Sequence, residues 1–294
     1  MSARPSLETP DQRVGRALGL SLLLAVVAAP MAWSLGYSLL YSLGGIGLFS
    51  DGWTLQHWRT ALQSGELAGS LLYSGAIACV VTSIATTCAL GFVLFAPQAR
   101  SDRRCLALLC LGLATPVAVT GLLTYQLLNP GGYLARLAFH AGSIASPSEF
   151  PTLVNDRWSI GLIVAQSIAV FPLLALFFLN TWSTARLDRY CALAESLGAT
   201  RRQARLRVAL PMLLRRGAPL ILLMLLWQFG SYEIPLLLGR QSPQMFSVMT
   251  QRHAGRFDLL DRPEAFALAV VYLLLVGAGV CVLIRWRRRR ADDA

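Results

Sequence analysis

Few side chains in this sequence have a pattern that could perform catalysis. The 294 residues include no lysine, so the chain has neither a Walker A lysine for a nucleotide phosphate nor a lysine able to form a Schiff base. The motifs H-E-x-x-H and G-x-S-x-G are also absent. We therefore expect no catalytic residue and no cofactor, and any use of ATP would require a separate protein.

The cysteines and histidines are too scattered to predict a metal site. None of the cysteines forms a CxxC pair or has the spacing of a zinc site. The six are Cys79, Cys88, Cys105, Cys110, Cys191 and Cys281. His57, His140 and His253 are equally isolated from one another. We expect the cysteines to pack as small residues and the histidines to lie in loops.

Glu233 is the one residue whose surroundings indicate a special role, because it is the only charge within a long apolar stretch. A carboxylate in lipid costs a few kcal/mol unless it is paired or hydrated, which makes it a functional candidate. Gly230, Ser231 and Pro235 are expected to loosen the helix around it. Two interpretations stay open: an interfacial carboxylate that reaches water or a neighbour, or a translocation-pathway group that favours a cationic cargo.

The composition predicts that these residues are positioned by membrane helices. Hydrophobic residues make up 55% of the chain and charged residues 14%, against about a quarter in soluble proteins. A span must cross about 30 Å of hydrocarbon and satisfy its own backbone hydrogen bonds, which favours helices. We predict an all-α membrane protein with six transmembrane helices. Their ranges are about 17–43, 68–95, 105–128, 158–181, 216–239 and 264–285.

The arginines predict the orientation of these helices. Placing the N-terminus in the cytoplasm puts 19 of the 26 arginines inside, so the positive-inside rule predicts that both termini are cytoplasmic. The expected organisation is a cytoplasmic tail at 1–16, a transmembrane domain at 17–285 and a basic cytoplasmic tail at 286–294. That tail is expected to contact anionic lipid rather than nucleic acid. The first apolar run is too long for a cleaved signal peptide.

The loop between the fourth and fifth spans, residues 186–216, predicts two short cytoplasmic helices. The first has an apolar stripe at helical spacing, formed by Tyr190, Leu193, Ala194 and Leu197. Gly198 can take a positive φ and is expected to end that helix. Thr200 and Gln203 have the spacing of a capping box for the second helix, and Pro211 is expected to interrupt it. The positive-inside rule alone explains the arginines, but an exposed apolar stripe indicates a partner groove.

This loop resembles the cytoplasmic loop of the permease subunits of type I ATP-binding-cassette (ABC) importers. Their signature is E-A-A, three residues, Gly, nine residues, Ile, one residue and Leu-Pro. Aligned on Gly198, the matching residues are Ala194, Gly198, Val208, Leu210 and Pro211. Two positions differ from the signature: Ala192 stands at the position of its Glu, and Leu193 stands at the position of its first Ala. Glu195 is the nearest acidic residue to the missing Glu. The similarity covers about 67–284, and 229–239 resembles the branch that carries polyamines, opines, phosphonates and ferric iron.

The resemblance implies a non-catalytic permease subunit in the inner (plasma) membrane of a bacterium. Its partners would be a dimer of ABC ATPase subunits, a second permease subunit (identical or sister) and a periplasmic or extracellular substrate-binding protein. The implied ATPase-coupling residues are Ala194, Glu195, Gly198, Ala199 and Arg201, with Val208, Leu210 and Pro211 leading into the fifth span. The implied cargo is a small solute such as a polyamine, a phosphonate or iron.

Two other classes stay open at this point. A secondary transporter would need several intramembrane charges and an inverted repeat, whereas this sequence has one such charge and no visible repeat. An integral membrane enzyme would need a nucleophile with a base, or a metal cluster. Co-purification of an ATPase subunit separates the importer from both.

Overall fold

The computed structural model describes residues 15, 18–19, 21–47, 52–100, 102–256 and 262–292. Helices joined by turns, bends and irregular segments make up these residues, and no strand occurs among them. The predicted tail at 1–16 lies outside the described part apart from Gly15, and so do the side chains of 286–294. The chain forms two compact units. Unit 1 contains Met1–Gln63 and His253–Leu274, and unit 2 contains Ser64–Arg252 and Leu275–Ala294.

Within the described ranges, five helical segments are long and apolar enough to cross a membrane. They are Ser21–Ser42, Gly65–Phe95, Ile160–Thr184, Arg201–Phe229 and Arg262–Arg285. A sixth span results if the bent pair Arg103–Ala114 and Val117–His140 crosses as one, although its two parts meet at 98°. Proline disfavours helical backbone in the residue before it, which explains the break at Thr115 and Pro116. The all-helical membrane class is thus confirmed.

Unit 1 contains η1 (Leu24–Ala28), α2 (Ala29–Ser42), α3 (Gln56–Gln63) and the first part of α14 (Arg262–Asp292). The rings of Tyr41 on α2 and Phe266 on α14 lie 4.5 Å apart, centre to centre. Trp58 on α3 donates its indole N–H to the hydroxyl of Ser42, at 3.2 Å. Aromatic packing and this hydrogen bond therefore connect the elements of unit 1.

Unit 2 is built around α4 (Gly65–Phe95), α8 (Ile160–Thr184) and α11 (Leu210–Phe229), which pack on one another. Small side chains on α4, such as Ala85 and Ala89, are buried in this core and let the helices approach closely. Gly217 on α11 faces the ring of Phe178 on α8, and a Cβ at this position would lie 2.5 Å from that ring. Only glycine therefore fits at position 217.

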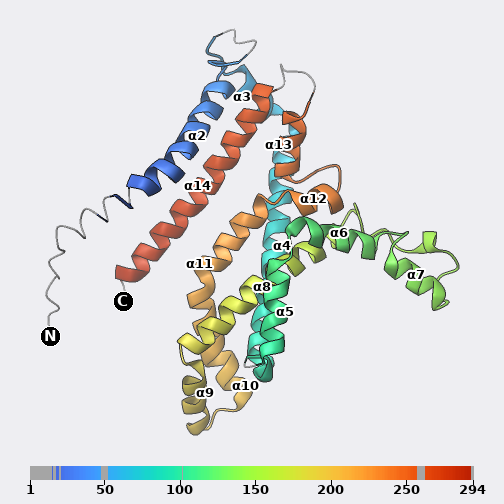
Figure 1. Cartoon of the computed structure of the whole chain (residues 1–294), viewed down its shortest axis with the longest axis vertical. Coiled ribbons are helices and arrows are strands. Elements are labelled where there is room, and N and C mark those ends of the chain that lie inside the picture. Colours follow the sequence, from blue (N-terminus) through green and yellow to red (C-terminus); the bar gives the residue numbers. More distant parts are fainter. Residues whose placement is uncertain are drawn as a thin grey trace. The chain divides into compact units, whose positions relative to one another are not determined.

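Shorter elements cap this core. They are η2 (Pro97–Arg100), α5 (Arg103–Ala114), α6 (Val117–Leu128), α7 (Tyr133–His140), η3 (Pro147–Glu149), α9 (Leu187–Ser196), α10 (Arg201–Ala204), η4 (Arg205–Ala209), α12 (Glu233–Leu238) and α13 (Phe246–Ala254). Within unit 2, α9 and α10 lie at one end, while α12 and α13 lie at the other (Figure 1). The predicted fifth span, 216–239, is divided between α11 and α12.

Candidate functional site

The helix α9 presents two apolar faces, one inward and one outward. Leu187 and Cys191 are buried, and Ala194 packs against the same core. Tyr190, Leu193 and Leu197 are 49%, 59% and 81% exposed. Ala194 therefore belongs to the inward face and not to the outer stripe that the sequence predicted. The remaining three residues form an apolar surface at the end of unit 2, which we call the outer stripe.

Gly198 ends α9 as predicted, with a φ of +93°. Its amide donates to the Glu195 carbonyl at 3.0 Å, and the amide of Ala199 donates to the Ala194 carbonyl at 3.0 Å. These two bonds form a Schellman motif, which satisfies carbonyls that a helix end otherwise leaves unpaired. The turn after α9 therefore has a fixed backbone geometry that depends on a residue tolerating positive φ.

The next helix starts with the capping box that the sequence predicted. The Gln203 amide donates to the Thr200 hydroxyl at 3.3 Å, and the Thr200 amide donates to the Gln203 side-chain oxygen at 3.0 Å. The two exposed helix-start amides are thereby paired without help from water. The second helix accordingly leaves the turn in one defined direction.

The expected interruption at Pro211 is wrong, because helix runs without a break from Arg201 to Phe229. A π-helical segment, η4, precedes the proline, and the amide of Leu210 donates to the Arg205 carbonyl five residues back. Proline is tolerated in the first turn of a helix, and Pro211 has that position in α11. The π turn thus joins α10 to the membrane helix as one continuous element.

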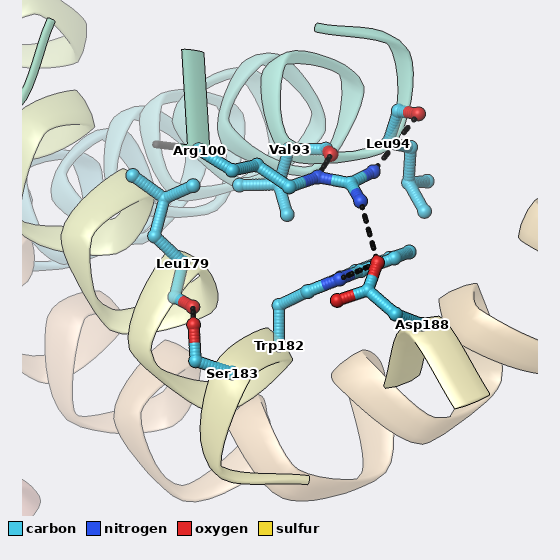
Figure 2. A network of polar contacts seen from close by, with 7 residues as sticks. All are labelled: Val93, Leu94, Arg100, Leu179, Trp182, Ser183 and Asp188. Carbon is cyan, nitrogen blue, oxygen red and sulfur yellow. Dashed lines mark hydrogen bonds and ion pairs between the residues drawn. The ribbon is translucent and has the colours of Figure 1, made fainter. Parts of the chain in front are cut away.

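A polar network holds the start of α9 against the ends of α4 and α8 (Figure 2). The Arg100 guanidinium donates from Nε to the Val93 carbonyl at 2.9 Å and from one Nη to the Asp188 carboxylate at 3.4 Å. Its central carbon lies 3.6 Å from the centre of the Trp182 ring, a cation–π contact. Trp182 in turn donates its indole N–H to Asp188 at 2.9 Å. One arginine therefore connects three helices.

Burial shifts the pKa values of two groups in and beside this network. It lowers the pKa of the Arg100 guanidinium, and the neighbouring Asp188 opposes that shift. An arginine nevertheless stays protonated in proteins, so the ion pair persists at every physiological pH. Burial likewise raises the pKa of the Cys191 thiol. Cys191 is therefore a neutral packing residue on the inward face of α9, as the sequence predicted, whereas Cys79, Cys88, Cys110 and Cys281 are exposed.

The predicted coupling residues form one local group, and the predicted pathway residue lies apart from them. Ala194, Glu195, Gly198, Ala199 and Arg201 make up the turn, and Val208, Leu210 and Pro211 continue along η4 and α11. Glu195 and Arg201 form a weak ion pair across the turn, at 3.9 Å. Glu233 lies at the opposite end of unit 2, with an exposed side chain in the first turn of α12.

Buried amides surround the break between α11 and α12. Gln166 on α8 is 1% exposed and donates to the Ser231 hydroxyl, and the Ser247 hydroxyl donates to the Ser231 carbonyl. The side-chain oxygen of Gln166 and the side-chain nitrogen of Gln228 have no hydrogen-bond partner among the described residues. The expected loosening near Glu233 is therefore a break at Gly230–Tyr232.

Arg100, Trp182 and Asp188 did not emerge as a group from the sequence. Arg100 counted only toward the charge balance, and Trp182 lies in the last turns of an apolar span. The one usable signal was an acidic residue in the first turn of a helix beside an arginine-rich loop. Arg100 and Asp188 are 88 positions apart in the chain, so the sequence does not reveal their contact.

Comparisons with known proteins identify the fold. No protein-family model and no curated protein matches the sequence. A chain of a bacterial alginate ABC transporter, crystallised with an alginate pentasaccharide-bound periplasmic protein, aligns with 94% of this chain and 93% of its own length. It is 15% identical, with a TM-score of 0.67. A chain of a bacterial ABC transporter involved in the import of the acidic polysaccharide alginate aligns over 94% and 99% at 16% identity, with a TM-score of 0.65. The chain thus shares the fold of these ABC transporter chains.

Proposed function

We propose that this chain is the transmembrane permease subunit of an ABC importer in a bacterial inner membrane. It forms part of the translocation pathway and receives force from a separate ATPase through α9 and the Gly198 turn. The outer stripe of Tyr190, Leu193 and Leu197 carries this proposal, because three exposed apolar side chains on a rigid turn require a partner groove. The fold shared with ABC transporter chains supports it.

The geometry allows a direct transfer of movement. The Schellman motif and the capping box fix the turn, and the continuous helix from Arg201 to Phe229 leads from it into the membrane. The Arg100 network holds the other end of α9 to α4 and α8. When the ATPase subunits close, a bound α9 would move with them, and α11 would tilt against its neighbours.

The proposed complex contains four kinds of partner. A dimer of ABC ATPase subunits binds and hydrolyses ATP, since this chain has no lysine for a nucleotide site. A second permease subunit, identical or sister, completes the pathway. A substrate-binding protein delivers a small solute at the outer face, and lipid surrounds the helices. Both termini face the cytoplasm in this arrangement, in agreement with the arginine distribution.

The candidate cargoes come from two sources. The sequence resemblance favours a polyamine, a phosphonate or iron, and the neighbouring structures concern alginate. We propose Glu233 as an entrance group on the external side, because its exposed carboxylate follows directly on the helix break. The ATPase activity of the reconstituted complex, measured with each of these solutes in turn, identifies the cargo class by the solute that stimulates it.

Photo-crosslinking in intact membranes tests the proposal. A photoreactive amino acid at Leu193 should give an adduct with a nucleotide-hydrolysing protein. The same group at Tyr133, which is 65% exposed on α7, is the matched control and should give none. If Leu193 yields no ATPase adduct, or if the purified chain alone transports solute, the assignment to an ABC importer fails.

A further inference from the structure

Arg240 lies just after α12 and contacts three separate segments of unit 2. Its guanidinium carbon lies 4.3 Å from the centre of the Tyr73 ring on α4, a cation–π contact. Its Nε donates to the Pro243 carbonyl at 3.1 Å, and one Nη donates to the Arg157 carbonyl at 3.2 Å. Arg240 therefore connects α4, the segment before α8 and the loop after α12, with the same chemistry that Arg100 uses at the other end of unit 2.

The loop after α12 and the helix α13 are also fastened along the first half of α4. The backbone amide of Phe246 donates to the buried hydroxyl of Ser74 on α4, at 2.8 Å. One Nη of Arg252 on α13 donates to the carboxylate of Glu66, in the first turn of α4, at 2.6 Å. Residues 240–252 therefore form a strap on α4, which we call the strap.

The apolar packing of unit 2 divides at the break between α11 and α12. The buried residues Leu213 and Met224 of α11 belong to a cluster that includes parts of α4, α8 and α9. The buried residues Ile234 and Leu238 of α12 belong to a second cluster, with other parts of α4 and α8. Among the described residues, neither cluster contains members of both α11 and α12. The helix break therefore coincides with a boundary between two packing groups.

Ser231, within the break, is held from the side of α8 and α13. The Gln166 side chain on α8 donates to its hydroxyl, and the Ser247 hydroxyl on α13 donates to its carbonyl. The last residue of α11, Phe229, stacks on the ring of Phe246, with the ring centres 6.4 Å apart. Aromatic rings attract one another over a range of offsets, so this contact tolerates a shift that hydrogen bonds do not. The chain can therefore bend between the end of α11 and Ser231.

We propose that Arg240 is a positioning residue, which holds α12 and the strap to α4 and α8 so that α11 can move without carrying them. This inference rests on the proposed function, because the ATPase drives α11 through the coupling turn. The driven movement then ends at the helix break, and the segment with the exposed Glu233 stays in place. Without Arg240, the strap would follow α11 and part of the movement would be lost.

Distance measurements on the full chain in lipid nanodiscs test the clamp. Spin labels are attached through p-acetylphenylalanine at Leu72 on α4 and Leu236 on α12, both exposed, and pulsed electron paramagnetic resonance gives their separation. Arg240→Ala removes two hydrogen bonds, and one lost hydrogen bond shifts a two-state population by about two- to tenfold. The distribution should therefore gain a second component. Arg136→Ala, at an exposed arginine of α7, should leave it unchanged.

Variants at Tyr73 test the same clamp from its other partner. Tyr73→Phe keeps the ring face under Arg240 and should keep the single distance between Leu72 and Leu236. Tyr73→Leu removes that face and should give the second component. Thermal unfolding in the same nanodiscs shows which variants are folded. An unchanged distribution in folded Arg240→Ala or folded Tyr73→Leu chain overturns the proposal.

The complex with the ATPase tests whether the strap stays in place. Between the nucleotide-free and the ATP–vanadate states, the distance from Leu72 to Trp227 on α11, an exposed residue, should change. The distance from Leu72 to Leu236 should not. Equal changes in both distances, or no change in either, overturn the positioning role.

The crosslinking experiment at Leu193 separates the two ways to fail. An ATPase adduct together with equal changes in both distances refutes the positioning role of Arg240 alone. A second component in the Arg240→Ala chain without any ATPase adduct refutes the importer assignment, and with it the driven movement of α11, but supports the clamp.

Discussion

The two ends of unit 2 differ in whether their polar groups are hydrogen-bonded. At the end that contains α9 and α10, the Schellman motif, the capping box and the Arg100 network pair the polar groups of the turn. At the other end, around Ser231, buried atoms of Gln166 and Gln228 have no partner among the described residues. The end with α9 and α10 is therefore held in one shape by its hydrogen bonds. The end around Ser231 contains buried polar atoms that can still form hydrogen bonds.

The energetic difference explains how such a molecule could work. A fully paired turn loses hydrogen bonds if it deforms, so it moves as a rigid body. An unpaired buried amide costs about 1–3 kcal/mol, and a rearrangement that pairs it recovers that free energy. The break at Gly230–Tyr232 places these amides where a change between two arrangements needs no helix to unfold. The following predictions test this contrast, from the largest expected effect to the smallest.

Gly198→Asp should abolish uptake while ATP hydrolysis and membrane insertion continue. A side chain at a φ of +93° costs about 1–2 kcal/mol and distorts the turn that the ATPase would bind. Uptake, ATPase activity and protein level in membranes measure this. Gly142→Asp is the control, because Gly142 also has a positive φ, +70°, and open space around it, but lies far from α9 in the chain. Normal uptake by the Gly198 variant would contradict the coupling role.

Leu193→Asp should reduce co-purification of the ATPase more than tenfold and leave the fold intact. A charge in the centre of a buried contact removes about 2 kcal/mol or more of binding free energy. Pull-down of the ATPase subunit measures the effect. Tyr133→Asp, at an exposed aromatic residue of α7, serves as the control. Equal recovery of ATPase with both variants would show that the outer stripe is not a docking surface.

Arg100→Ala should lower both stability and transport, but only in part. The substitution removes hydrogen bonds made by a charged group, which are worth about 1.5–3 kcal/mol of stability. The contribution of the bond to Asp188 is smaller, because that carboxylate is exposed. The substitution also uncovers the ring of Trp182. Thermal unfolding in detergent and uptake rates measure the two effects. Arg104→Ala removes the same charge from an exposed side chain and should change neither. If the two variants behave alike, the network does not anchor α9.

Glu233→Gln should change uptake of the transported solute by less than about twofold, because glutamine keeps the hydrogen-bonding capacity of an exposed entrance group. Initial uptake rates at several solute concentrations provide the measurement. A tenfold loss would instead indicate a cationic cargo and a pathway role that depends on charge. Glu149→Gln, in the external loop predicted from the sequence, controls for general changes in surface charge.

The sequence predicted the parts of the molecule that depend on local rules. The positive φ at Gly198 and the capping box of Thr200 and Gln203 are confirmed, because both depend on residues close together in the chain. The helical membrane class is confirmed by the long apolar segments. Pro211 was misjudged because the π turn before it cannot be read from spacing alone. Ala194 was placed on the wrong face since helical periodicity does not identify which face meets the core.

Contacts between distant segments could not be predicted in this way. The meeting of Arg100 with Asp188, and a pocket between α4 and α11, both depend on how helices pack. The lack of a hydrogen-bond partner for the buried hydroxyls of Thr82 and Thr86, among the described residues, is likewise a property of the folded state. A single sequence therefore reveals local turns more readily than contacts between distant segments.

The contact between Gly217 and Phe178 has a mechanical consequence. A slide of α11 along α8 would move Gly217 away from the ring of Phe178 and bring bulkier parts of α11 toward it, at a point where a Cβ on residue 217 would already lie 2.5 Å from the ring. The two helices are thus locked in longitudinal register. In the proposed importer, a push on α9 would therefore reach α11 as a rotation about the contact between Gly217 and Phe178 rather than as a slide along α8.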